Sequence, residues 1–213
     1  MLHAHRWVVV TLFVLSLVLV RQGVAQATIG TNSCLPDVPT ACTGNTGDIG
    51  DESCQGTNAC EDNAGEVGDN SCQGNFACRS NAGEVADLSC TELQACQQNA
   101  GNIGRRACQG AAACLVNSDS IHKKACVGPD ACDSNTGNIS KKACVGLVAC
   151  GLNTGDVGAN SCQGEAACAY NSGKIAKRAC QGDHACFHNA LDRKKGECNG
   201  PPVNGVGVCE RPF

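Results

Sequence analysis

The chain has 213 residues, among them 20 cysteines and 26 glycines, while only 3% of its residues are aromatic. Its formal net charge at pH 7 is −4. So few large apolar side chains exclude an ordinary globular core. The lack of aromatic residues that could stack on bases argues against a nucleic-acid-binding protein.

Residues 1–27 are predicted to be a secretory signal peptide. The segment starts with His3, His5 and Arg6, continues with an apolar run over 7–20, and ends in small residues up to Ala27, where we expect cleavage. The run is shorter than the roughly 20 residues of a membrane-spanning helix. We therefore expect a secreted, extracellular or cell-surface protein without a membrane span; an uncleaved signal anchor is the alternative.

A Cys-x5-Cys pair recurs every 18 residues from Cys54 to Cys186. A second signature follows each pair, as in Asn63–Val67 and Asn135–Ile139. Eight uninterrupted repeats of a short unit predict a solenoid, and several glycines per unit favour short β segments and tight turns over helices. We predict an all-β parallel β-helix (β-solenoid) of 18-residue coils, with one disulfide per coil and capped ends.

The expected organisation has four parts. They are the signal peptide at 1–27, an N-terminal capping coil at 28–53, the eight-repeat disulfide-braced segment at 54–197 and a C-terminal cap at 198–213. Both caps contain a longer, proline-bearing version of the cysteine unit, which would cover exposed strand edges.

All 20 cysteines follow the predicted cleavage site, and in an exported chain such a set is a disulfide framework. Zinc sites need closer cysteine pairs and usually histidine, so we expect no metal and no cofactor. Pairing across the longer gaps would leave Cys34 and Cys209 about 48 Å apart, far beyond the roughly 7 Å between the Cα atoms of a disulfide. Pairing within units predicts Cys34–Cys42, Cys54–Cys60, Cys72–Cys78, Cys90–Cys96, Cys108–Cys114, Cys126–Cys132, Cys144–Cys150, Cys162–Cys168, Cys180–Cys186 and Cys198–Cys209.

Two resemblances support a coiled architecture over residues 49–186. The segments Ile49–Cys54 and Val127–Cys132 resemble the hexapeptide repeat of left-handed parallel β-helices, whose coils are also 18 residues long. The Cys-x5-Cys ladder is similar to that of beetle antifreeze proteins, which are disulfide-braced β-solenoids with a shorter coil. Hexapeptide phasing would turn the cysteines outward, whereas a braced core needs them inward, so the handedness of the coil stays open.

Charge changes sign along the chain. Residues 28–100 hold 11 acidic residues and one basic residue, and residues 101–213 hold 9 acidic and 13 basic residues. Adjacent charged pairs cannot lie in a strand with one buried face, so they mark a corner of the coil. The candidate anion-binding residues at this corner are Arg105, Arg106, Lys123, Lys124, Lys141, Lys142, Lys177 and Arg178. A merely solvated edge is the alternative.

No enzyme is expected, because the constant unit length leaves no room for a catalytic loop. We expect a secreted, non-enzymatic structural or surface-interaction protein that binds an anionic polysaccharide or another extracellular surface, or that associates head to tail with itself. An ice-binding protein is the alternative, because a column of small residues runs from Thr46 to Ala190; a carbohydrate-active enzyme of the parallel β-helix type is a distant third. Asn138, in the sequon Asn138-Ile-Ser140, is a candidate glycosylation site.

Overall fold

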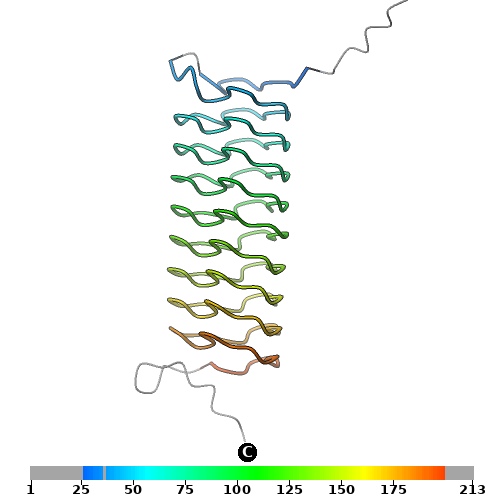
Figure 1. Cartoon of the computed structure of the whole chain (residues 1–213), viewed down its shortest axis with the longest axis vertical. Helices are drawn as coiled ribbons and strands as arrows, with labels where there is room; N and C mark the ends of the chain where they lie inside the picture. Colours follow the sequence, from blue (N-terminus) through cyan, green and yellow to red (C-terminus); the bar gives the residue numbers. More distant parts are fainter. Residues whose placement is uncertain (1–25, 36, 200–213) are drawn as a thin grey trace, which may run out of the picture.

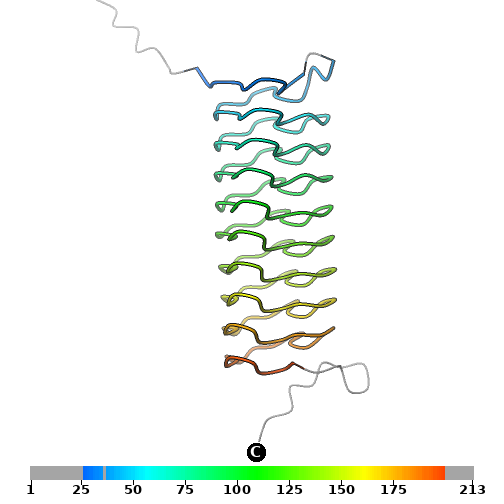
Figure 2. The same ribbon diagram turned by 180° about the vertical axis from the view of Figure 1, so that it is seen from behind.

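The structure, a computed structural model, describes residues 26–35 and 37–199. In this part of the chain, similar 18-residue units lie one above another along a single axis (Figure 1, Figure 2). Backbone hydrogen bonds join residues about one unit apart. For example, the Cys78 N–H donates to the Ala59 carbonyl at 2.6 Å, and the Gly68 N–H donates to the Val85 carbonyl at 2.7 Å. The period of the sequence is therefore also the period of the structure.

The predicted fold class is wrong. Within the described residues there is no helix, and the β-bridges between neighbouring units are isolated parallel bridges between single residues. One column of bridges runs through the buried Ile and Val side chains, as in Val67 with Val85, and a second starts at Gln109 with Val127. Since no sheet is formed in residues 26–35 and 37–199, the prediction of an all-β parallel β-helix (β-solenoid) is not met.

Left-handed backbone conformations explain why strands do not form. In the unit that begins at Cys90, positive φ angles occur at Cys90 (55°), Gln94 (55°), Gln98 (55°) and Arg106 (58°). Each such residue redirects the backbone, and between Gln98 and Arg106 only Ile103 takes part in β-bridges. Sequence reasoning placed tight turns at glycines and a corner at the charged pairs, which include Arg106; it did not place turns at Cys90, Gln94 and Gln98, which carry side chains.

Hydrogen bonds to the preceding unit hold these residues in the left-handed region. The N–H of Gln94 donates to the Asn75 carbonyl at 3.0 Å, and the N–H of Gln98 donates to the Arg79 carbonyl at 2.8 Å. A left-handed conformation costs an L-residue roughly 1–2 kcal/mol, and an unpaired buried N–H would cost a comparable amount. Stacking of the units therefore compensates for a conformation that an isolated unit would not favour.

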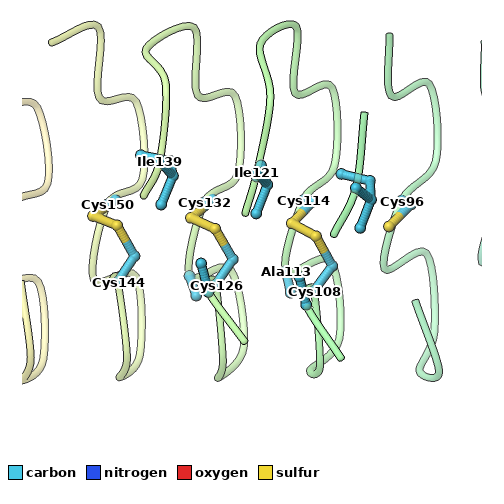
Figure 3. Packing of buried hydrophobic residues seen from close by; sticks show 14 of the residues in the cluster. Cys96, Cys108, Ala113, Cys114, Ile121, Cys126, Cys132, Ile139, Cys144 and Cys150 are labelled. Carbon is cyan, nitrogen blue, oxygen red and sulfur yellow. A yellow bond between two sulfur atoms is a disulfide. The ribbon is translucent and has the colours of Figure 1, made fainter. Parts of the chain in front are cut away.

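Disulfides form the centre of the stack. Figure 3 shows Cys108–Cys114 and Cys126–Cys132 in successive units, beside the side chains of Ile121 and Ile139. The cysteines point inward, so the outward phasing of hexapeptide β-helices does not apply to this chain. The described disulfides are the within-unit pairs from Cys34–Cys42 to Cys180–Cys186. The predicted Cys198–Cys209 pair lies outside the described residues, because Cys209 is not among them.

A ladder of buried asparagines runs beside the disulfides. In each step the Nδ2 of one Asn donates to the Oδ1 of the Asn in the preceding unit, as from Asn99 to Asn81 at 2.7 Å. The same Nδ2 donates to the carbonyl two residues further along, as from Asn99 to Gly101 at 2.6 Å. Both amide protons are thereby used, which a buried amide requires. The fully buried members are Asn63, Asn81, Asn99, Asn117, Asn135, Asn153 and Asn171.

The first described residues stack on the next unit in the same way. Ile29 bridges to Ile49, and the Gly30 N–H donates to the Ile49 carbonyl at 2.7 Å. Nearly all of the predicted signal peptide and of the C-terminal cap lies outside the described residues. No helix in the described part is long and apolar enough to span a membrane.

Candidate functional site

The basic pairs lie at a turn of each unit. Arg106, Lys124 and Lys142 have φ angles of 58°, 60° and 58°, and the residue before each one is exposed. In a strand, successive side chains point to opposite faces. A turn instead allows both members of a pair to reach solvent, so two adjacent cations are accommodated without burying either charge.

These pairs stack on one another from unit to unit. The Lys124 N–H donates to the Arg105 carbonyl at 3.1 Å, and the Lys142 N–H donates to the Lys123 carbonyl at 3.2 Å. At a rise of about 4.8 Å per unit, each like-charge contact in water costs roughly 1 kcal/mol or less. We call this column the basic ridge: Arg105, Arg106, Lys123, Lys124, Lys141, Lys142, Lys177 and Arg178.

The ridge is interrupted once before its last pair. Ala159 and Asn160 occupy the corner between Lys142 and Lys177. The backbone continues without a break, because the Asn160 N–H donates to the Lys141 carbonyl and the Arg178 N–H donates to the Ala159 carbonyl, each at 3.1 Å. The structure thus brings all eight predicted cations to one edge, as three consecutive pairs and one separated pair.

Acidic residues occupy the same corner in the N-terminal half, and we call Asp51, Asp69 and Asp87 the acidic ridge. The Oδ1 of Asp69 accepts the Asp51 N–H at 2.8 Å, and the Oδ1 of Asp51 accepts the Thr31 N–H at 2.6 Å. The Thr31 N–H lowers the pKa of Asp51 below its usual value. At the junction of the ridges, Arg105 Nε lies 3.8 Å from Asp87 Oδ2.

Two shallow hollows lie beside the basic ridge. The larger has a volume of about 540 Å³, and its border includes both Lys174 and Lys177 and the acidic Asp119 and Asp156. The second has a volume of about 400 Å³, and its border includes His122, Lys123 and the acidic Glu84. Small residues such as Gly104, Gly158 and Ala176 line them, which leaves room for a ligand next to the cations.

The candidate glycosylation site belongs to this face. Asn138 lines both hollows, and the Ser140 of its sequon lines the larger one. Ile139, between them, is fully buried, so Asn138 and Ser140 occupy the outward positions of a short extended segment. A glycan on Asn138 would therefore occupy the space next to the basic ridge.

Sequence reasoning missed an aromatic cluster at another corner. The rings of Tyr170 and His188 stack with centroids 4.6 Å apart, and Phe187 meets His188 edge to face at 4.3 Å. Tyr170 is 48% exposed and Phe187 is 38% exposed. The available signal was the spacing, because Tyr170 and His188 are one 18-residue unit apart.

The groups of ligand-type residues close enough to share a metal ion are cysteine trios in the described part of the chain. One trio is Cys90, Cys96 and Cys108. Their sulfur atoms are in disulfides, and a disulfide sulfur does not supply the thiolate that a metal binds. These trios are part of the core of the stack.

The column of small residues considered for ice binding faces solvent. Its exposed members are Thr46, Ala64, Ala82, Ala100, Ser118, Thr136, Thr154, Ser172 and Ala190. Hydroxyl side chains are therefore consecutive only in the part from Ser118 to Ser172. A second column of small residues, which includes Ser53 and Ala107, is fully buried.

One family model matches the chain twice, over residues 25–113 and over residues 106–209. Its description is Domain of unknown function (DUF7640). The chain belongs to this family. It matches no curated protein and no solved structure.

The two matches to the DUF7640 model differ in their corner charges, although the first also contains Arg105 and both contain Arg106. The first includes the acidic ridge, and the second includes most of the basic ridge. What the two segments share is the cysteine pairs and the buried Asn ladder. Membership of this family therefore identifies the repeated scaffold and leaves the role of the surface columns to physical argument.

Proposed function

We propose that the protein is a secreted, non-enzymatic structural or surface-interaction protein that binds an anionic polysaccharide along the basic ridge. The observation that carries this proposal is the regular stacking of exposed cation pairs beside two hollows. Disulfides throughout the described units are consistent with an extracellular location. Export itself depends on the predicted signal peptide and is part of the proposal.

A polymer suits this surface better than a small anion. An exposed charge pair contributes only about 0.2–1 kcal/mol, so one cation pair would not hold a small anion. A linear polyanion can place charged groups over several units at once, and the contacts then share a single loss of translational freedom. Binding of this kind weakens strongly with salt.

The test is retention of the oxidised mature protein on an anionic polysaccharide matrix across a salt gradient. The ridge variant replaces six consecutive cations by alanine: Arg105, Arg106, Lys123, Lys124, Lys141 and Lys142. We expect salt-sensitive retention of the native protein and early elution of this variant. Equal, weak retention of the two proteins would show that the ridge does not bind the matrix and is only a solvated edge.

A second variant separates the ridge from net charge. It carries the same six alanines and adds lysines at six exposed positions scattered over other columns: Thr57, Ala82, Gln98, Ala111, Thr136 and Leu152. Its net charge equals that of the native chain. If the ridge is the site, this variant elutes with the ridge variant; if it is retained like the native protein, binding depends on net charge alone.

Ice binding is a second candidate, favoured by the exposed small column. Its hydroxyl-bearing stretch, from Ser118 to Ser172, offers a short flat row of side chains in register. Thermal hysteresis of the mature protein tests it, with Thr136→Lys as the disrupting change. Absence of hysteresis removes this candidate without affecting the proposed polysaccharide binding.

A further inference from the structure

The charged corner has an order that goes beyond a simple change of sign. Successive backbone hydrogen bonds place its pairs in a continuous stack, as from Glu52 N–H to the Thr31 carbonyl and from Leu88 N–H to the Asp69 carbonyl. From the N-terminal end, the first eight corner pairs are Thr31-Asn32, Asp51-Glu52, Asp69-Asn70, Asp87-Leu88, Arg105-Arg106, Lys123-Lys124, Lys141-Lys142 and Ala159-Asn160; the pair Lys177-Arg178 stacks after them and has no counterpart among these eight levels. One neutral level, three acidic levels, three basic levels and one neutral level follow in that order.

When these eight levels are set against the same levels in reverse order, each acidic level faces a basic level and each neutral level faces a neutral level. We propose that two copies of the chain associate side by side and antiparallel, about a two-fold axis that passes between the levels of Asp87 and Arg105. Such an axis brings Asp87 opposite Arg105 of the second copy, and it repeats the same contact by symmetry. The remaining acidic levels then meet basic levels, Asp69 with Lys123 and Asp51 with Lys141, and the neutral levels meet each other.

The side chains at this corner can make such contacts. Arg105 Nε already lies 3.8 Å from Asp87 Oδ2 within one chain, and both side chains are about half exposed. An arginine at this corner therefore reaches an aspartate one level away. Opposite a second copy, the same groups face each other at a single level.

The neighbouring outward columns also fit this arrangement. Next to the corner, Gly68 would meet His122 and Ala86 would meet Gly104, all at one outward position of the unit; Ala86 and Gly104 permit close approach, and Gly68 leaves space opposite the larger His122 side chain. One column further, Glu84 would meet Asn102. The same column sets Asp48 opposite Asn138 and Glu66 opposite Ser120. Since none of these contacts joins two like charges, no column in the overlap opposes the arrangement.

The size of the overlap sets the expected strength. With eight levels about 4.8 Å apart and about five residues of roughly 3.3 Å across, each copy would contribute on the order of 600 Å². This is less than the roughly 800 Å² per partner of a standard stable interface. We therefore expect a dissociable dimer held largely by charge. Its dissociation constant should rise at least about tenfold between roughly 0.01 M and 1 M salt.

Sedimentation velocity of the oxidised mature protein, over a range of concentrations and without any polysaccharide, tests the proposal. One variant reverses the acidic ridge (Asp51→Lys, Asp69→Lys, Asp87→Lys), and another reverses three cations (Arg105→Glu, Lys123→Glu, Lys141→Glu). Each variant alone should be monomeric, because like charges would face each other. An equimolar mixture of the two should form a heterodimer.

Controls keep the result interpretable if a reversal disturbs folding. Asp51→Asn, Asp69→Asn and Asp87→Asn remove the charges but keep an Oδ1 that can accept the backbone N–H bonds of Thr31 and Asp51. This variant should dimerise more weakly than the native protein. Reversal of three exposed acids away from the corner, Glu92→Lys, Glu165→Lys and Asp183→Lys, should leave dimerisation unchanged.

Three results would overturn the proposal: a native protein that is monomeric at low salt, variants that dimerise as well as the native chain, or a mixture that does not associate. Growth of the native protein beyond a dimer would indicate an open head-to-tail contact and would also overturn it. The proposal shares the basic ridge with the proposed polysaccharide binding. The two can fail independently, because this experiment contains no polysaccharide.

Discussion

The interior of a unit and its charged corner differ in how much the sequence varies. Inside, the Asn ladder and the cysteines are the same in unit after unit, whereas the corner changes from aspartate to lysine. An inward side chain must bond to or pack against the equivalent side chains in the units before and after it. Asn99, for example, donates to Asn81 and accepts from Asn117. A corner side chain meets mainly water. The interior therefore sets the scaffold, and the corner is free to carry function.

The largest effect is expected at the Asn ladder. Asn99→Ala removes the hydrogen bonds of Asn99 to Asn81 and Gly101 and the bond that it accepts from Asn117. Because an unsatisfied buried polar group costs about 1–3 kcal/mol, we expect a local destabilisation of roughly 3–5 kcal/mol. Native-state hydrogen exchange of amides in the neighbouring units measures it.

The exposed Asn102 of the same unit is the matched control for this change. Its Oδ1 accepts the Glu84 N–H at 3.0 Å, in contact with solvent. Asn102→Ala should cost less than about 1 kcal/mol, as most surface substitutions do. Equal effects of Asn99→Ala and Asn102→Ala would contradict the contrast between the interior and the surface.

The next largest effect is expected from removing one disulfide. Cys108→Ala combined with Cys114→Ala opens a short loop and leaves space in the core, and we expect a loss of about 2–4 kcal/mol. Denaturant unfolding of the oxidised proteins measures it. Peptide mapping without reduction should recover the Cys90–Cys96 and Cys126–Cys132 pairs unchanged in this variant. A new bridge between units, such as Cys96–Cys126, would show that the pairing is less local than the structure indicates.

A smaller effect is expected in the aliphatic column. Ile139→Val removes one methyl group from a fully buried side chain, which typically costs about 0.5–1.5 kcal/mol. Valine occupies the same column at Val157, so the backbone accommodates it. Thermal unfolding should place this variant near the low end of that range. A loss as large as that of Asn99→Ala would mean that apolar packing, and not the polar ladder, dominates the interior.

The smallest effect is expected from protonation at the surface. Backbone N–H donors lower the pKa of Asp48 and the pKa of Asp51, each through a residue of the first stacked segment. A group whose pKa is lower in the folded state stabilises folding above its unfolded pKa, and this contribution is lost as the pH falls through the folded pKa. Melting temperature should therefore fall slightly below about pH 4.

Asp51→Asn identifies the source of this acid sensitivity. The amide oxygen can still accept the Thr31 N–H but does not titrate in this range. The variant should lose part of the decrease in melting temperature on acidification, because it already lacks the contribution of the ionised carboxylate at neutral pH and should melt slightly lower than the native protein there. An unchanged pH profile would assign the sensitivity to other carboxylates.

Much of the local organisation could be predicted from the sequence. The 18-residue period assigned Cys60 and Cys78 to equivalent positions. Pairing within units, which leaves no cysteine without a nearby partner, gave the bridges that the structure contains. The adjacent lysines at Lys123 and Lys124 indicated a corner, because a half-buried strand cannot carry two neighbouring charges. These inferences succeeded because each rests on spacing along one chain.

The fold class could not be predicted in this way. Residues such as Gln94 and Val116 have no intrinsic preference for positive φ, yet both adopt it, at 55° each. Their N–H groups find acceptors only in the preceding unit, at Asn75 and Gln97. The aromatic cluster of Tyr170 and His188 was missed for a related reason, since the two rings meet only when the units stack.

The sequence by itself determined the period, the equivalence of positions and the order of charge along the axis, because an exact repeat assigns every residue to a column. Only the tertiary structure decided how each column faces and which backbone shape it takes. The left-handed turns and the Asn ladder exist because a neighbouring unit supplies their hydrogen-bond partners, and a single unit contains no such partner.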